Sequence, residues 1–288
     1  MATRIVVGMA DGRVRVDGVE LAYREVGSGD PIVLLHGNPV SSYLWRNVFP
    51  RLADLGRVIA PDLAGMGRSG PAPSYRFFDH RRYLEGFLRE VGAADHVVLV
   101  GHDWGGSLAF DWASTHPDAL RGLAYCETIV RPRSWADEPS EGQDFFRRLR
   151  SPEGERLVLQ ENVFVDEILP VAIQGLTDAD LAVYREPYLE PGESRRPMLT
   201  WAREIPFDGE PADVAAAVSA YGAWLAGSPV PKLFIAAEPG MILVGEARRF
   251  AESFPNQTVV TVPSGHFVPE DASDALVTAL REWIPGLA

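Results

Sequence analysis

One aspartate stands where a strand is expected to give way to a helix, in a setting that suits a nucleophile. Residues 97–106 read V-V-L-V-G-H-D-W-G-G, which puts Asp103 at the centre of a G-x-D-x-G motif behind an apolar strand. Glycines at these positions permit the sharp strand–turn–helix elbow that holds a nucleophile at the tip of a sheet. The alternative is that Asp103 only caps the following helix, but a cap would leave the flanking glycines unexplained.

A carboxylate nucleophile favours chemistry at a saturated carbon. Attack by a serine hydroxyl on an alkyl carbon would give an ether, which water does not readily cleave. Attack by a carboxylate gives an ester, which water can open at its carbonyl carbon. Asp103 therefore predicts displacement at an sp³ carbon through a covalent alkyl-enzyme intermediate.

Opening such an ester needs a base, and His266 is the best placed of the six histidines. It lies in V-P-S-G-H-F-V-P-E-D, after the last predicted strand and before the C-terminal helix. His36 belongs to a loop motif, and His102 adjoins the nucleophile and is expected to point elsewhere. Three more histidines stand in helical or strand-start contexts, where a structural role is expected: His80, His96 and His116.

The base also needs a carboxylate partner that fixes its tautomer and stabilises its charged form. Glu127 ends the strand after the nucleophile helix, and Glu238 ends the next strand. Both positions can reach a histidine at this edge of a sheet. Spacing along the sequence does not choose between them.

Neutral hydrogen-bond donors flank the nucleophile. The loop H-G-N-P at residues 36–39 follows an apolar strand, and its backbone N–H groups can form an oxyanion hole with that of Trp104. The Asn38 amide and the Trp104 indole add two side-chain donors. Neutral donors facing an attacking carboxylate indicate a departing anion such as a halide, because they stabilise it without pairing permanently with Asp103. Simple packing of Trp104 against the cavity wall is the alternative.

An alternation of strands and helices must position these residues. Residues 13–16 and 21–26 are expected to form a hairpin around Asp17 and Gly18. Continuous Val/Ile/Leu runs, typical of strands buried on both faces, follow at 31–35, 57–60, 96–100, 122–126, 232–236 and 258–262. Amphipathic stretches predict helices at 43–55, 78–91, 107–116, 212–226, 245–253 and 272–284. This alternation predicts an α/β fold with a mostly parallel sheet.

The alternation stops in the middle of the chain. Residues 130–213 contain no predicted strand but many aromatic residues and prolines. We expect this segment to form a helical cap over the sheet, while residues 1–129 and 214–288 form the main domain. A separate structural domain with no role in the site is the alternative.

Composition excludes several classes of protein. The 288 residues include 27 Lys and Arg against 40 Asp and Glu, a net charge of −13, so nucleic acid is not an expected partner. Cys126 is the only cysteine, which excludes an internal disulfide and a thiolate zinc cluster, and we expect it to be buried. No apolar run is long enough to cross a membrane, and the N-terminal stretch lacks the apolar core of a signal peptide. These features predict a cytoplasmic protein.

Several longer motifs carry a family resemblance. They read H-G-N-P-x-S-S-Y-L-W-R-N at residues 36–47, D-L-x-G-M-G-x-S at 62–69 and G-H-D-W-G at 101–105. Shorter matches include F-D-W-A at 110–113 and R-E-P-Y-L at 185–189. With them, the sequence resembles the haloalkane dehalogenases from about residue 13 to residue 285.

The resemblance implies the α/β-hydrolase fold, with a mostly parallel eight-stranded sheet flanked by helices and a helical cap. It implies that Asp103 is the nucleophile, His266 the base and Glu127 the acid. It also implies that Asn38 and Trp104 bind the halide. The resemblance further places five side chains in an apolar substrate pocket, with ordinary core packing as the alternative: Phe146, Phe164, Met241, Ile242 and Phe267.

The expected reaction converts a haloalkane and water into an alcohol, a halide ion and a proton. The family needs no metal and no organic cofactor. We expect a monomer, with a homodimer as the alternative, and no membrane partner.

The main alternative function is that of an epoxide hydrolase, which uses the same elbow aspartate with an aromatic residue after H-G and tyrosines in the lid. Here Asn38 follows H-G, although Tyr184 and Tyr188 lie in the lid segment. A luciferase-type oxygenase and a non-enzymatic binding protein of the same fold are further alternatives.

Overall fold

In the computed structural model, which describes residues 10–287, the strands form one eight-stranded sheet in the order β1-β2-β4-β3-β5-β6-β7-β8. The first two pairings in this order, β1 with β2 and β2 with β4, are antiparallel, and all the others are parallel. The strand bounds are Ala10–Val16 (β1), Val19–Val26 (β2), Pro31–Leu35 (β3), Arg57–Pro61 (β4), Val97–His102 (β5), Leu120–Cys126 (β6), Lys232–Pro239 (β7) and Gln257–Ser264 (β8). Residues 1–9 and residue 288 lie outside the described residues. The beginning of the predicted main domain falls there, and so does the beginning of the N-terminal stretch that lacks a signal-peptide core.

The buried strands follow from their apolar sequence. All five residues of β3 are fully buried, and their side chains alternate between the two faces of the sheet: Ile32 and Leu34 join one core cluster, Val33 and Leu35 the other. The hairpin between β1 and β2 turns at Asp17 and Gly18, whose φ angles are 49° and 84°. Two positive φ angles are what the tight hairpin turn requires, so the predicted turn is confirmed.

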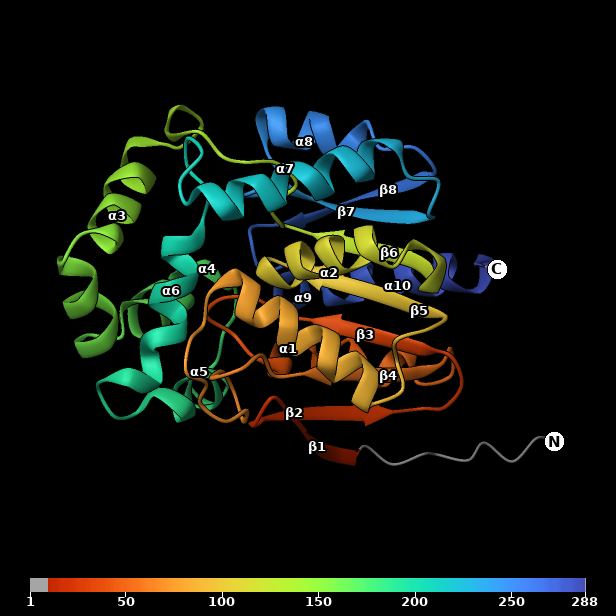
Figure 1. Ribbon diagram of the computed structural model, residues 1–288, viewed down its shortest axis with the longest axis horizontal. Helices are drawn as coiled ribbons and strands as arrows, with labels where there is room; N and C mark the ends of the chain where they lie inside the picture. Colours follow the sequence, from red (N-terminus) through yellow and green to blue (C-terminus); the bar gives the residue numbers. More distant parts are fainter. Residues whose placement is uncertain (1–9, 288) are drawn as a thin grey trace.

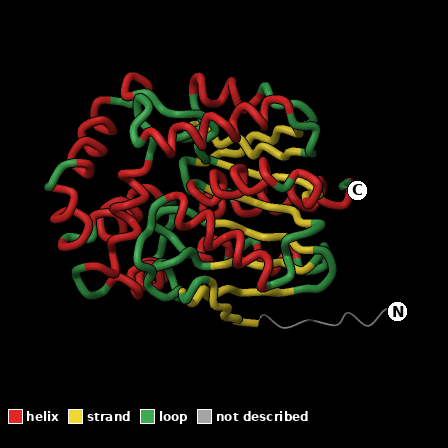
Figure 2. Tube along the Cα trace, viewed as in Figure 1, coloured by secondary structure: helices red, strands yellow, loops and turns green. Residues whose placement is uncertain are grey.

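Helices cover both faces of the sheet (Figure 1, Figure 2). One face packs against α1, α2, α7 and α8, and the opposite face packs against α9 and α10. Their bounds are Phe77–Glu90 (α1), Trp104–Thr115 (α2), Ala212–Gly227 (α7), Gly245–Glu252 (α8), Val268–Asp271 (α9) and Ser273–Trp283 (α10). Within residues 10–287, no helix is both long enough and apolar enough to cross a membrane.

The predicted helix at residues 43–55 is wrong. The structure has two short 3₁₀ turns there, Ser42–Trp45 (η1) and Phe49–Leu52 (η2). Pro50 lies in the first turn of η2 and has no N–H to donate to a preceding carbonyl, so it prevents one continuous helix over these residues. The amphipathic pattern is nevertheless real, because Leu44, Trp45, Phe49 and Leu52 are buried against the sheet.

A helical segment connects β6 to β7 and contains no strand, as predicted. Figure 1 shows it at the end of the sheet where the parallel strands finish. Its longer elements are α3 (Ser140–Arg150), α4 (Leu169–Ala172), α5 (Asp178–Arg185) and α6 (Arg196–Glu204), with π-helical turns at Glu155–Gln160 (η5) and Phe164–Ile168 (η6). Short 3₁₀ turns complete it at Trp135–Asp137 (η4), Glu186–Tyr188 (η7) and Glu193–Arg195 (η8), and one more 3₁₀ turn, η3 (Pro117–Ala119), lies between α2 and β6. The last turn of the chain is η9 (Ile284–Gly286).

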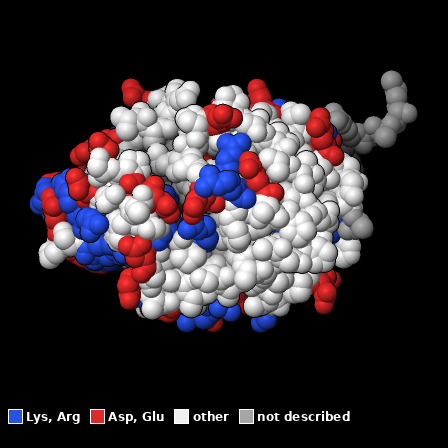
Figure 3. Space-filling view, turned by 90° about the horizontal axis from the view of Figure 1, so that it is seen from above, with Lys and Arg blue, Asp and Glu red and all other residues white. Residues whose placement is uncertain are grey.

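Exposed side chains of this segment form ion pairs. Arg148 and Arg156 both contact Glu153, at 2.8 and 2.9 Å. In the view of Figure 3, basic side chains lie beside acidic ones at this end of the molecule. Exposed pairs of this kind contribute little to stability, so the position of the segment depends on its buried contacts.

Candidate active site

Asp103 occupies a sharp elbow between β5 and α2. Its backbone has φ 51° and ψ −131°, a conformation that residues other than glycine rarely adopt. A Cβ atom on Gly101 would lie 2.3 Å from the Cα of Gly106, and one on Gly105 would lie 2.3 Å from the carbonyl oxygen of Leu35. The glycines are therefore required by the close approach of the turn to its own helix and to β3.

The Asp103 carboxylate is buried and held on one side. Its Oδ2 accepts a hydrogen bond from the backbone N–H of Asn38 at 2.8 Å, and the side chain is about one tenth exposed. Burial raises the pKa of Asp103, while the nearby His266 and the backbone N–H groups of Trp104 and Asn38 oppose that rise. A carboxylate that has lost most of its hydration in this way is a stronger nucleophile than a hydrated one.

His266 lies between two carboxylates. Its Nε2 is 3.9 Å from Oδ1 of Asp103, and its Nδ1 is 3.6 Å from Oε2 of Glu127. The imidazole is mostly buried, and Glu127 is completely buried. Both separations are slightly longer than hydrogen bonds, as is common at catalytic sites without a bound substrate. The arrangement matches a base with one nitrogen toward the nucleophile and the other toward an orienting acid.

The structure distinguishes the two candidate acids. Glu127 directly follows β6, and its carboxylate accepts hydrogen bonds from the backbone N–H groups of Met241, Ile242 and Leu243, at 2.8, 2.7 and 3.3 Å. Glu238, near the end of β7, is exposed to solvent. Only Glu127 is placed beside His266, so its geometry fits the orienting acid.

The two expected halide donors also meet at the elbow. Asn38 reaches Asp103 through its backbone N–H, and its side-chain Nδ2 lies 3.4 Å from the carbonyl oxygen of Met198 on α6. Trp104 follows Asp103 directly and is 2% exposed. Its indole stacks on the indole of Trp201, also on α6, with 4.7 Å between ring centroids. One helix of the segment between β6 and β7 therefore contacts both donors.

The five residues expected to line the pocket lie in different parts of the structure. Phe267 packs its ring 4.7 Å from that of His266, while Phe146 and Phe164 come from α3 and η6. The ring of Phe164 is 5.8 Å from that of Phe145, and the ring of Phe146 is 5.4 Å from that of Phe207. Phe267 therefore lies beside the site, whereas the ring contacts of Phe146 and Phe164 are with other aromatic residues of the helical segment.

Met241 and Ile242 contact the site through their backbone. The Met241 side chain is 58% exposed and so is not enclosed in a pocket. Ile242 is partly buried and lines a small cavity of about 220 Å³ beside residues 128–133. The N–H groups of both residues instead hold Glu127, a contact that sequence reasoning missed because it depends on where a loop lies in space.

Two further histidines support the site. The Nε2 of His102 lies 2.9 Å from the carbonyl oxygen of His266. Burial lowers the pKa of His102 well below its usual value, so the ring is neutral and can donate its Nε2 proton to that oxygen. His36 accepts the backbone N–H of Leu63 at Nε2, at 2.9 Å, and lies 2.9 Å from the carbonyl oxygen of Gly37 at Nδ1. The proton of His36 therefore belongs on Nδ1, which fixes the donor loop.

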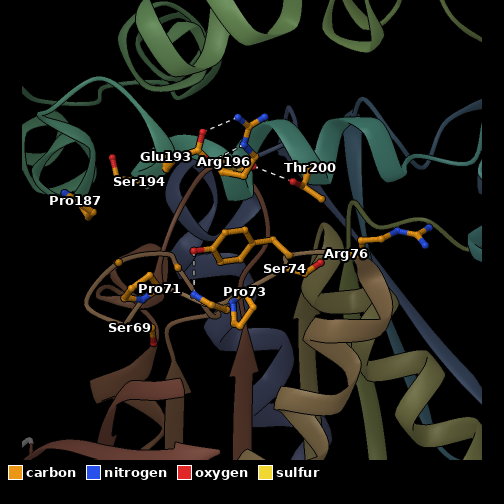
Figure 4. Close-up of a pocket in the computed structure, with 14 residues that line it drawn as sticks. Ser69, Pro71, Pro73, Ser74, Arg76, Pro187, Glu193, Ser194, Arg196 and Thr200 are labelled. Carbon is orange, nitrogen blue, oxygen red and sulfur yellow. Dashed lines mark hydrogen bonds and ion pairs between the residues drawn. The ribbon is translucent and has the colours of Figure 1, made fainter. Parts of the chain in front are cut away.

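A cavity of about 770 Å³ lies apart from these residues (Figure 4). It is lined by the loop of residues 65–76 and by the outer side of α6, with Pro71, Pro73 and Arg76 opposite Arg196 and Thr200. None of the five candidate catalytic and halide-binding residues lines it. This cavity is therefore separate from the residues that carry the proposed chemistry.

The described residues offer no cluster of metal ligands. Within residues 10–287, no three or more His, Cys, Asp or Glu side chains are arranged to hold a metal ion. The sole cysteine, Cys126, is fully buried as predicted, and burial raises the pKa of its thiol. That the reaction needs neither metal nor organic cofactor stays a prediction.

The sheet order, the elbow and the aspartate–histidine–glutamate arrangement define a class of protein. Residues 30–273 match the family model described as the alpha/beta hydrolase fold, so the α/β-hydrolase fold expected from the resemblance is confirmed.

Individual relatives narrow the class. The chain is 48% identical over 278 residues to a haloalkane dehalogenase of Sphingobium indicum, which covers 94% of each chain. It is 45% identical to a haloalkane dehalogenase of Mycolicibacterium smegmatis, covering 93% of this chain and 89% of the relative. The crystal structure of haloalkane dehalogenase DbeA from Bradyrhizobium elkani USDA94 superimposes with a TM-score of 0.92 at 40% identity, covering 97% and 98% of the two chains. The chain belongs to the haloalkane dehalogenase family.

Proposed function

We propose that the protein hydrolyses haloalkanes to an alcohol, a halide ion and a proton, through an alkyl ester on Asp103. The observation that carries the proposal is a buried elbow carboxylate held by the Asn38 N–H, with His266 and Glu127 aligned behind it. The close similarity to haloalkane dehalogenases supports the same activity.

In the first step, one oxygen of Asp103 attacks the carbon that bears the halogen. Oδ2 is held by the Asn38 N–H, so Oδ1 is the free oxygen that forms the new carbon–oxygen bond. The carbon–halogen bond breaks in line, and the halide leaves with both bonding electrons. The side-chain N–H groups of Asn38 and Trp104 stabilise the negative charge as it develops. One such donor typically contributes about 10²- to 10³-fold in rate.

In the second step, water opens the ester. His266 takes a proton from water at Nε2, and the water oxygen attacks the carboxyl carbon of Asp103. The negative charge that forms on Oδ2 meets the Asn38 N–H, while Glu127 stabilises the imidazolium. The bond between the carboxyl carbon and the alkyl oxygen then breaks, and the departing alkoxide takes the remaining proton of the former water, which releases the alcohol and restores the Asp103 carboxylate. His266 returns its proton to solvent.

The epoxide hydrolase alternative needs a free tyrosine hydroxyl to protonate the epoxide oxygen. The Tyr184 hydroxyl donates a hydrogen bond to Glu270, which also pairs with Arg46. Tyr188 is completely buried, and burial raises its pKa. The Tyr184 hydroxyl is thus already engaged by Glu270, and the similarity to haloalkane dehalogenases further favours the haloalkane reaction.

Three further expectations belong to this proposal. Residues 130–213 act as a cap over the site, supported by the contacts of α6 with Asn38 and Trp104. The protein acts in the cytoplasm, and it acts as a monomer. Light scattering on the purified protein tests the monomeric state directly.

The direct test is bromide release from 1-bromobutane by purified protein, compared with Asp103→Ala. We expect steady bromide release by the wild-type protein and none above background by the variant. A parallel assay with 1,2-epoxybutane separates the two reactions. Opening of the epoxide without bromide release would contradict the proposal and support the alternative.

A further inference from the structure

Three aromatic rings form a continuous stack behind the elbow. The Trp104 indole stacks on Trp201 with ring centroids 4.7 Å apart and planes inclined at 26°. Trp201 stacks in turn on the imidazole of His80, at 4.4 Å and 22°. The three residues come from α2, α6 and α1, and each is at most 2% exposed. The indole that the proposed function assigns to the halide therefore rests on a second indole, which rests on a histidine.

His80 contributes a flat, uncharged surface to this stack. Burial lowers its pKa to about 3, so the imidazole is neutral at physiological pH. Within residues 10–287, neither of its ring nitrogens nor the Nε1 of Trp201 has a hydrogen-bond partner. Neither ring is held by polar contacts to described residues, so the position of Trp201 is set by ring packing on both of its faces.

A buried carboxylate fixes the two helices that supply this packing. Glu204, at the end of α6, accepts the backbone N–H of Phe77 and the Nε of Arg76, both at 3.0 Å. Phe77 is the first residue of α1, where the free N–H groups and the helix dipole favour a negative charge. Glu204 is 5% exposed, and Phe77 also packs its ring 5.9 Å from Trp104. This contact fixes the position of α6 relative to α1, and therefore the position of Trp201 relative to His80.

We propose that Trp201, backed by His80, is a positioning residue that sets the orientation of the Trp104 indole and therefore how well the enzyme stabilises a departing halide. The inference rests on the proposed function, because it needs Trp104 to be a halide donor. Its consequence concerns the leaving group. Chloride departs less readily than bromide and depends more on hydrogen-bond donors, so a loosened indole harms chloride release more.

The test compares kcat for 1-chlorobutane with kcat for 1-bromobutane in Trp201→Leu and Trp201→Phe. We expect the chloride-to-bromide ratio to fall about tenfold in the leucine variant, which lacks a ring, since small misplacements of a positioned group are costly. The phenylalanine variant keeps a smaller ring, and its ratio is expected to fall about twofold.

The chain supplies a matched control in Trp112→Leu. Trp112 is buried near the other end of α2 and also stacks on a histidine, His116, at 4.5 Å and 11°. Its loss should lower thermal stability to a similar degree while leaving the chloride-to-bromide ratio at the wild-type value. Stability is measured by thermal unfolding of all three variants.

The possible outcomes distinguish a failure of the proposed function from a failure of the positioning role of Trp201. A wild-type protein that releases no halide would overturn the proposed function itself. Wild-type activity with an unchanged ratio in both Trp201 variants would overturn only the positioning role. If the leucine variant does not fold, the phenylalanine variant decides, and an unchanged ratio there overturns the inference. A ratio that falls equally in Trp112→Leu would also overturn it, because the effect would then be general.

Discussion

The Nδ1 of His266 lies 3.6 Å from Oε2 of Glu127, and that same oxygen accepts the backbone N–H groups of Met241 and Ile242. The backbone N–H groups of Met241 and Ile242 thus hold the carboxylate in the position from which it orients the histidine. Because these contacts hold Oε2 beside Nδ1, the carboxylate is placed to orient the imidazole.

Replacing Glu127 with glutamine should therefore slow ester hydrolysis much more than halide release. The amide keeps the size of the side chain but removes the charge that stabilises the protonated His266. We expect a rapid burst of bromide in the first turnover, followed by a steady rate lower by about 10²- to 10⁴-fold. Rapid-quench measurement of bromide resolves the two phases.

Glu238→Gln is the matched control for that variant, because Glu238 ends the neighbouring strand but is exposed. Its steady rate should equal that of the wild-type protein. A slow Glu238→Gln protein beside an unaffected Glu127→Gln protein would reverse the assignment of the acid.

Asp103 should be a source of instability as well as of activity. Burial raises its pKa in the folded protein above the unfolded value, so its contribution to stability is fully present below the unfolded pKa and is lost as the pH rises through the folded pKa. At pH 7, Asp103→Asn removes the buried charge, and the melting temperature should increase by roughly 2–4 °C per kcal/mol recovered.

That gain should shrink on acidification, since the wild-type carboxyl then becomes protonated in the fold. Thermal unfolding of both proteins at neutral pH and near pH 4 measures it. A variant that melts below the wild type at pH 7 would show that the charge is compensated by its neighbours.

Gly37 should tolerate no side chain. A Cβ there would lie 2.2 Å from Oδ2 of Asp103 and 2.7 Å from the backbone nitrogen of Trp104. Gly37→Ala must therefore displace the nucleophile from the Asn38 N–H, and we expect activity to fall by about 10²-fold or more. Gly227→Ala is the control, since a Cβ at Gly227 meets no atom within 4 Å. Bromide-release rates of the two variants check the prediction, and equal rates would contradict it.

Much of the main fold could be predicted because its signals are local. Each parallel strand is a short apolar run between turn signals, and the structure places a strand at every predicted position. The exception at residues 43–55 shows the limit of periodicity, which located a buried face around Leu44 and Leu52 but overlooked the effect of Pro50 on the helix.

The site residues likewise differ in whether the local sequence predicts them. Asp103 carries a strong local motif, whereas the choice between Glu127 and Glu238 depends on burial, which spacing does not reveal. The stack of His80, Trp104 and Trp201 joins residues from three distant helices, and nothing in the local sequence of each predicts that they meet. Contacts of this kind follow only from the packing of α6 against α1 and α2.

Replacement of His266 with phenylalanine should trap the covalent ester on Asp103. Without the base, the first step should proceed and the second should stop, because the variant lacks the imidazole that faces Asp103 and would take the proton from water. After exposure to 1-bromobutane, we expect about one bromide released per protein molecule. We also expect a butyl group on the peptide that contains Asp103, detected by mass spectrometry. Sustained turnover by this variant, or a full equivalent of bromide with an unmodified Asp103 peptide, would contradict the proposed mechanism.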